Sequence, residues 1–207
     1  MTGARARRLI GAALVAALGC APALAQQGPS WVFPAHPTTP PEDKVITTVD
    51  TYHYEERRFE PEIVVEAVPP EAVDYASPER AFISRFSAMI RGDYDGFMAS
   101  WDDVSRQLTE VNDAGRGQTP TLYVETWRSI FSAASATMVR RIDTGDYVII
   151  TYRYVLPDGT VLQDIEFPGM FREYANGWRA TQELASDDLL AVSPWVTGET
   201  DVTQVVR

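Results

Sequence analysis

The change of periodicity close to residue 135 constrains the fold of this chain more than any other feature. Before it, apolar residues recur at helical spacing, and after it apolar and aromatic residues follow the spacing of β-strands. The strand segments are separated by turn residues at 143–146, 157–159 and 176–177, and short turns connect antiparallel strands. The sequence therefore predicts an α+β domain in which three helices pack on one side of a bent antiparallel sheet.

The helical half carries clear start and stop residues. Ser77-Pro78-Glu79 combines an N-cap, a proline at the first helical position and an acid in the first turn. Gly92 ends this helix, and Thr119-Pro120 begins another. A helix between them is expected from about residue 93, and Asp102 and Asp103 are interpreted as a helix C-terminal turn rather than metal ligands. Its inner face is expected to consist of Phe97, Met98, Trp101, Val104 and Leu108.

Strands are predicted throughout the second half. Tyr147–Val155 is dense in β-branched and aromatic residues, which favour a strand. Pro168 and Gly169 fall inside another strand pattern, where such residues indicate a bulge or a sharp bend. The predicted strands are 138–142, 147–155, 160–167 with a resumption at 170–174, and 178–184.

The chain divides into five predicted parts. Residues 1–25 form a signal peptide, and residues 26–44 form a Pro-rich flexible spacer. Residues 45–76 place strand-type residues around a charged stretch, which predicts either an added hairpin or an extended arm docked on the main domain. The main domain is assigned to residues 77–190 and a C-terminal tail to residues 191–207.

The N-terminus has the three-part layout of a secretory signal. Arginines at positions 5, 7 and 8 precede an apolar stretch, and Ala23-Leu24-Ala25 is a small-x-small cleavage site. Cleavage between Ala25 and Gln26 predicts a periplasmic or secreted protein. In the alternative interpretation, the residues before Cys20 form a loose lipobox, and Cys20 is lipidated and anchors the protein to a membrane.

Composition excludes several classes of partner and cofactor. The net charge is −11 at pH 7, so the surface repels phosphate backbones, and no nucleic-acid partner is expected. No stretch reaches the roughly 20 apolar residues of a transmembrane helix, so no membrane span is expected. Cys20 is the single cysteine, and no acids or histidines stand at ligand spacing; we therefore expect no metal and no cofactor.

Residues 77–186 resemble the nuclear transport factor 2-like superfamily, which includes SnoaL-like proteins and ketosteroid isomerase. The matching stretches are Phe86–Asp103 (FSAMIRGDYDGFMASWDD) and Glu173–Thr181 (EYANGWRAT). The resemblance implies a cystatin-like cone, a curved sheet that wraps three helices around a conical pocket. It also implies that the outer sheet face could form a homodimer. It does not imply an activity, since a fold alone does not give function.

The residues that catalyse reactions in this superfamily lack counterparts here. The ketosteroid isomerase branch has a carboxylate base shortly after the Asp-Asp pair, whereas residues 104–108 contain no acid. The first helix lacks the tyrosine of that branch. Dehydratase-type relatives use a His-Asp pair, but His36 and His53 lie outside the domain. No general base is expected at the positions that the resemblance indicates.

Asp164 remains the candidate for a catalytic base. Its carboxylate would line the interior if its strand face points inward, and it would be solvated if Ile165 and Phe167 point inward instead. Strand arginines at 140, 153 and 179 would either hold an anionic ligand or pair with acids such as Asp164 and Glu183. The candidates for lining a ligand pocket, or for plain core packing, are Trp101, Tyr123, Trp127, Arg140, Tyr152 and Phe167.

Three hypotheses follow from the sequence. The first is a non-catalytic envelope domain that binds a small apolar or weakly anionic ligand, or a protein partner. The second is a SnoaL-like isomerase, cyclase or hydrolase that acts on a small apolar substrate with an atypical carboxylate such as Asp164. The third is an assembly factor that uses the spacer and the arm at residues 45–68. An interior filled by rings would favour the third, and an inward Asp164 the second.

Overall fold

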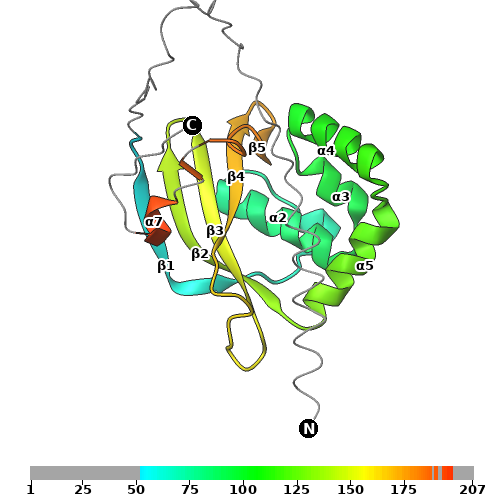
Figure 1. Ribbon diagram of the computed structural model, residues 1–207, viewed down its shortest axis with the longest axis horizontal. Helices are drawn as coiled ribbons and strands as arrows, with labels where there is room; N and C mark the ends of the chain where they lie inside the picture. The colour runs from blue at the N-terminus through cyan, green and yellow to red at the C-terminus, as the bar shows by residue number, and fades with distance from the viewer. Residues whose placement is uncertain (1–51, 188, 191–192, 198–207) are drawn as a thin grey trace, which may run out of the picture. The chain divides into compact units, whose positions relative to one another are not determined.

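A single five-stranded antiparallel sheet carries a group of helices on one face (Figure 1). The computed structural model describes residues 52–187, 189–190 and 193–197. The predicted α+β class and the antiparallel strands are confirmed. In chain order the elements are β1 (Glu55–Val64), the 3₁₀ helix η1 (Pro70–Ala72), α2 (Pro78–Arg91), α3 (Tyr94–Ala99), α4 (Asp103–Arg116), α5 (Pro120–Phe131), β2 (Ser135–Thr144), β3 (Tyr147–Val155), β4 (Phe167–Tyr174), β5 (Gly177–Ala180) and α7 (Pro194–Thr197).

The sheet has the order β1-β2-β3-β4-β5, so β3 lies at its centre. The bounds of β3 are those predicted from its β-branched and aromatic residues. Strand β1 comes from the charged part of the segment at 45–76 and pairs with β2 from Glu55 to Val64. It precedes the helices in the chain and forms one edge of the sheet. Residues 45–51, which carry the first strand-type residues of that segment, lie outside the described residues, as do the signal peptide and the spacer.

The prediction of one continuous helix from about residue 93 to residue 108 is wrong. It is two helices, α3 and α4, separated at residues 100–102. The backbone N–H of Ala180 on β5 donates to the Ser100 carbonyl at 2.9 Å, and the Asp102 N–H donates to the Ala180 carbonyl at 2.9 Å. Asp102 is therefore the N-cap of α4 rather than part of a C-terminal turn, and its carboxylate accepts from the Ser105 N–H at 2.8 Å.

Because of this break, α4 turns a different face toward the rest of the domain from the one predicted. Val104 and Leu108 were expected on an inner face, but they are 60% and 46% exposed. The buried residues of α4 are Ser105 and Thr109, whose side chains hydrogen-bond Gln182. The helix thus uses hydrogen bonds, not apolar packing, to hold the segment after β5.

The predicted strand at residues 160–167 is also wrong. Residues 156–166 form a loop with a single isolated bridge between Val155 and Val161, and β4 begins at Phe167. Pro168 and Gly169 pair with Thr151 and Ile150 inside β4. The last strand, β5, ends at Ala180, four residues earlier than predicted, because residues 183–186 turn away.

Apolar side chains cover both faces of the sheet. Helix α2 packs against β3, β4 and β5 on one face, which we call the helix face. On the opposite face, Ile142 and Ile149 pack against Leu189 and Trp195 of the C-terminal segment. Within the described part of the chain, no helix combines the length and the apolar character needed to cross a membrane.

Candidate functional site

Aromatic rings fill the space between α2 and the helix face of the sheet. Phe82 and Phe86 lie one helical turn apart on α2, and their ring centroids are 4.3 Å apart. Tyr152 of β3 lies 5.3 Å from Phe82 and 4.8 Å from Phe86. Phe171 of β4 also contacts Phe82, and these rings are at most 8% exposed. Close ring packing of this kind fills the space between α2 and β3 with aromatic side chains.

A second ring cluster lies among the helices. Phe97 of α3 packs on Trp127 of α5, with 4.8 Å between centroids, and Tyr123 lies 5.5 Å from Trp127. Trp101, in the break between α3 and α4, lies 6.1 Å from Phe97. The structure thus brings together three of the predicted pocket residues, Trp101, Tyr123 and Trp127. The other aromatic candidates, Tyr152 and Phe167, are 5.6 Å apart on the helix face.

The guanidinium of Arg85 stands at the border of these two clusters. Its Cζ lies 4.0 Å from the Phe97 centroid and 3.7 Å from the Trp101 centroid. Its Nη1 donates to Ser100 Oγ at 2.7 Å, and Ser100 in turn donates to the Phe97 carbonyl. Among the described residues, no carboxylate pairs with Arg85, although the chain has 29 acids against 18 basic residues.

The ionisable groups around Arg85 are tyrosines. Burial lowers the pKa of Arg85 to about 9, against the opposing effects of Tyr152, Tyr75 and Tyr123. Burial raises the pKa of Tyr152 to about 12. Burial and a hydrogen bond to Asp113 also raise the pKa of Tyr123. At neutral pH the site therefore holds one cation surrounded by uncharged phenols.

Tyr75 and Arg179 lie beside this site. Arg179 of β5 stacks on Tyr75, with its Cζ 3.9 Å from the ring centroid, and its Nη1 donates to the Trp178 carbonyl. Burial raises the pKa of Tyr75, while the charges of Arg179 and Arg85 both act to lower it. Trp101 adds a free donor, because its Nε1 is buried and has no hydrogen-bond partner among the described residues. The Arg85 site thus has a second guanidinium beside it and an indole N–H that no described residue accepts.

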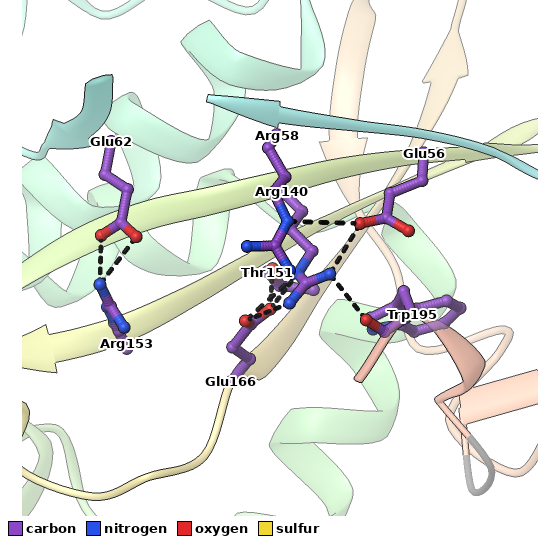
Figure 2. A network of polar contacts seen from close by, with 8 residues as sticks. All are labelled: Glu56, Arg58, Glu62, Arg140, Thr151, Arg153, Glu166 and Trp195. Atoms are coloured by element: carbon purple, nitrogen blue, oxygen red, sulfur yellow. Dashed lines mark hydrogen bonds and ion pairs between the residues drawn. The ribbon is translucent and has the colours of Figure 1, made fainter. Parts of the chain in front are cut away.

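Arg140, predicted as a pocket residue, lies on the opposite face of the sheet (Figure 2). Its Nε donates to Glu166 at 2.9 Å, and its Nη1 donates to Glu56 at 2.7 Å and to the Trp195 carbonyl at 2.6 Å. Thr151 also donates to Glu166, at 2.8 Å. Arg140 is therefore held by three separate segments of the chain and does not join the other pocket candidates.

A β-bulge causes this misplacement. Met138 pairs with Tyr152, whereas Arg140 pairs with Thr151, so β2 gains one residue at Val139. Adjacent residues of β3 point to opposite faces, and the extra residue sends Arg140 away from the face of Met138 and Tyr152. Without the bulge, simple alternation would place Arg140 on the helix face.

Asp164 does not enter the ring-lined interior. It is exposed in the loop before β4, where it lines a hollow of about 70 Å³ together with Arg153 and Glu166. Neither strand interpretation of this segment applies, and Ile165 is 56% exposed. A larger hollow of about 220 Å³ lies beside the bulged part of β1 and is lined by Arg58, Phe59, Glu60, Pro61, Glu62 and Val139.

The strand arginines differ in whether they pair with an acid. Arg153 pairs with Glu62 at 2.7 Å. Glu183, an expected partner, pairs with Arg172 rather than with Arg179. Arg179 has no carboxylate partner among the described residues. The described residues also contain no group of three histidine, cysteine or acidic side chains that could hold a metal ion.

Arg85 is the functional candidate that the sequence analysis missed. It follows Phe82 by three residues and precedes Met89 by four, so it falls within the apolar stripe of α2. An arginine at this spacing faces the interior, where charges are rare without a partner. That position was the available signal, but the ring contacts from α3 could not be inferred from α2 alone.

Comparisons with known proteins yield no match: no family model matches the chain, and no curated protein or solved structure does so.

Proposed function

We propose that this protein is an exported, non-catalytic domain that binds a small ligand at Arg85, on the helix side of its sheet. The observation that carries the proposal is the Arg85 guanidinium, which contacts the Phe97 and Trp101 rings and has no carboxylate partner among the described residues. A charge removed from water without a partner destabilises a fold. A bound anion would remove that cost.

The chemistry of the site supports binding rather than catalysis. General acid–base catalysis needs a group that titrates near the working pH. Burial raises the pKa of Tyr152 to about 12 and lowers that of Arg85 only to about 9, so both groups stay protonated at neutral pH. Asp164, the candidate for an atypical catalytic base, is exposed in a loop away from the rings.

For the fold, we propose a cone of the nuclear transport factor 2-like type, with α2 inside the curve of the sheet. Ring contacts from α2 to β3 and β4 support this placement. The ring filling at the centre limits the ligand site to the region around Arg85. The proposed location is the periplasm or the exterior of the cell, and its support is the signal-like sequence that ends at Ala25.

The second candidate is an assembly factor that engages a protein partner, and the interior filled by aromatic rings favours it because little room is left for a large ligand. A homodimer through the sheet is part of this second candidate. Leu189 and Trp195 of the C-terminal segment cover part of the opposite face, where Arg140 also lies. A dimer would therefore use the rest of that face.

Native mass spectrometry of protein purified from its own envelope fraction tests the proposal. We expect a polypeptide that begins at Gln26 and carries a small molecule, which is released on denaturation. A protein that carries no small molecule and binds none from a panel of apolar and anionic compounds would contradict the proposal. A diacylated Cys20 would change the location to a membrane anchor and leave the binding site unaffected.

A further inference from the structure

We infer that Arg85 anchors the carboxylate of a small, mostly apolar organic acid. This inference rests on the proposed binding function and adds the chemical class of the ligand.

The described residues leave most N–H donors of Arg85 without an acceptor. A guanidinium has five N–H donors in one plane. The Phe97 and Trp101 ring centroids lie 4.0 and 3.7 Å from its Cζ, so these two rings cover part of the guanidinium. Ser100 Oγ is the single hydrogen-bond acceptor that the described residues supply. The remaining N–H groups point along the plane, and an in-plane pair of oxygens is the geometry of a carboxylate.

Among the described residues, Arg85 and the adjacent Arg179 lack an acid partner, in contrast to the arginines on the opposite face of the sheet. On the opposite face, Arg140 pairs with Glu56 and Glu166, and Arg153 pairs with Glu62. Acids outnumber basic residues in the chain, so a shortage of carboxylates does not explain the difference. The acid that would complete the Arg85 site is therefore expected to come from a ligand.

The surroundings of Arg85 determine the rest of the ligand. The part-buried Trp101 and Tyr123 offer apolar ring surface, and Trp101 Nε1 is a buried donor that has no partner among the described residues. Arg85 and Trp101 are half-buried, so the site lies at the border between the rings and solvent. A net charge of −11 disfavours multiply charged anions such as phosphate. These features together favour a monoanion with an apolar body.

Calorimetric titration of the exported chain with matched acid and amide pairs tests the inference. The probes are benzoate with benzamide, and octanoate with octanamide, and inorganic phosphate is the third kind of anion. We expect a carboxylate to bind at least about tenfold more tightly than its amide and than phosphate, because the amide lacks the charge that Arg85 would pair with.

Variants identify the anchoring residue. Arg85→Gln is expected to weaken carboxylate binding at least about tenfold, and Arg85→Lys is expected to restore part of the affinity because it keeps the charge without the planar fork. Arg128→Gln is the matched control, since Arg128 is exposed on α5, and its affinity is expected to stay within about twofold of wild type. Circular dichroism of each variant checks that it is folded.

The outcomes separate this inference from the proposed function. Equal binding of acid and amide, or unchanged carboxylate binding by a folded Arg85→Gln variant, would overturn the carboxylate inference and leave a ligand-binding domain. Tighter binding of phosphate than of either carboxylate would also overturn it. Failure of every probe to bind, together with purified protein that carries no small molecule, would overturn both.

Discussion

Two arginines on opposite sides of one sheet have contrasting surroundings. Arg140 donates to two carboxylates and to the Trp195 carbonyl, and its side chain is 9% exposed. Arg85 donates to a single serine hydroxyl and otherwise contacts two rings. The fold supplies acceptors for most of the N–H groups of Arg140, whereas most of those of Arg85 have no acceptor among the described residues.

The contrast shows how an arginine can be assigned to stability or to binding. The contacts of Arg140 connect β1, the loop before β4 and the C-terminal segment to β2, so its role follows from what it joins. Within the described part of the chain, Arg85 joins no distant segment through a charge pair. Its free donors, and the Trp101 Nε1 that has no partner among the described residues, instead support the proposed ligand site.

The largest effect is expected for Arg140→Ala. This change leaves Glu166 and Glu56 without their partner, and removal of one member of a buried ion pair costs about 3–5 kcal/mol. Urea unfolding should report a loss of that size, whereas Arg128→Ala at an exposed position should change the free energy of unfolding by less than about 0.5 kcal/mol. If Arg140→Ala lowered the free energy of unfolding by less than about 1 kcal/mol, Arg140 would not have the stabilising role that distinguishes it from Arg85.

A smaller effect with a defined pH dependence is expected for Glu79→Gln. Burial acts to raise the pKa of Glu79, but hydrogen bonds from Arg141 and other groups hold it below its ordinary value. A lowered pKa stabilises the fold above the ordinary pKa of glutamate, and this stabilisation is lost as the pH falls through the lowered value. We therefore expect the variant to lose about 1–2 kcal/mol at pH 7.

The acid limb of the stability curve provides the check. The difference between wild type and Glu79→Gln should shrink as the pH falls below about 4 and should vanish where both side chains are uncharged. A difference that grows toward low pH would have the wrong sign. It would show that the Arg141 pair does not favour the charged carboxylate.

Arg85→Met is expected to change stability little. Methionine keeps the apolar part of the side chain against Phe97 and Trp101, and it removes a charge that no acid among the described residues pairs with. The free energy of unfolding of ligand-free protein should stay within about 1 kcal/mol of wild type or rise. A loss as large as that of Arg140→Ala would assign Arg85 to the stability of the fold.

The smallest effect is expected for Asp164→Asn. The carboxylate is exposed in a loop and pairs with neither Arg85 nor Arg140. Stability should change by less than about 0.5 kcal/mol, and ligand binding should not change. A large loss of a measured turnover in this variant would instead support the enzymatic hypothesis.

Local signals in the sequence predicted the elements that depend on local physics. The Ser77 and Thr119 caps and the composition of β3 act within a few residues, and each appears in the structure as predicted. The break between α3 and α4 was missed because it depends on hydrogen bonds to Ala180, nearly 80 residues away. No local pattern contains that information.

The candidate site shows the same division. Aromatic residues predicted for a pocket do gather, because apolar rings at helical and strand spacing face a common interior. Arg140 was misplaced because a bulge at Val139 reverses the alternation of β2, and a bulge of this kind leaves no mark in the composition of the strand. Arg85 was missed although its place in the α2 stripe was visible.

The indole N–H resonance of Trp101 offers the most direct test of the contrast between the two arginines. Its Nε1 is buried, unpartnered and part of the ring that covers Arg85, so a carboxylate held there should shift this resonance in a saturable way. In a titration with benzoate, with the resonance assigned through Trp101→Phe, the shift should occur in wild type and disappear in Arg85→Met. A resonance that stays in place in wild type, or that shifts equally in both proteins, would contradict the account.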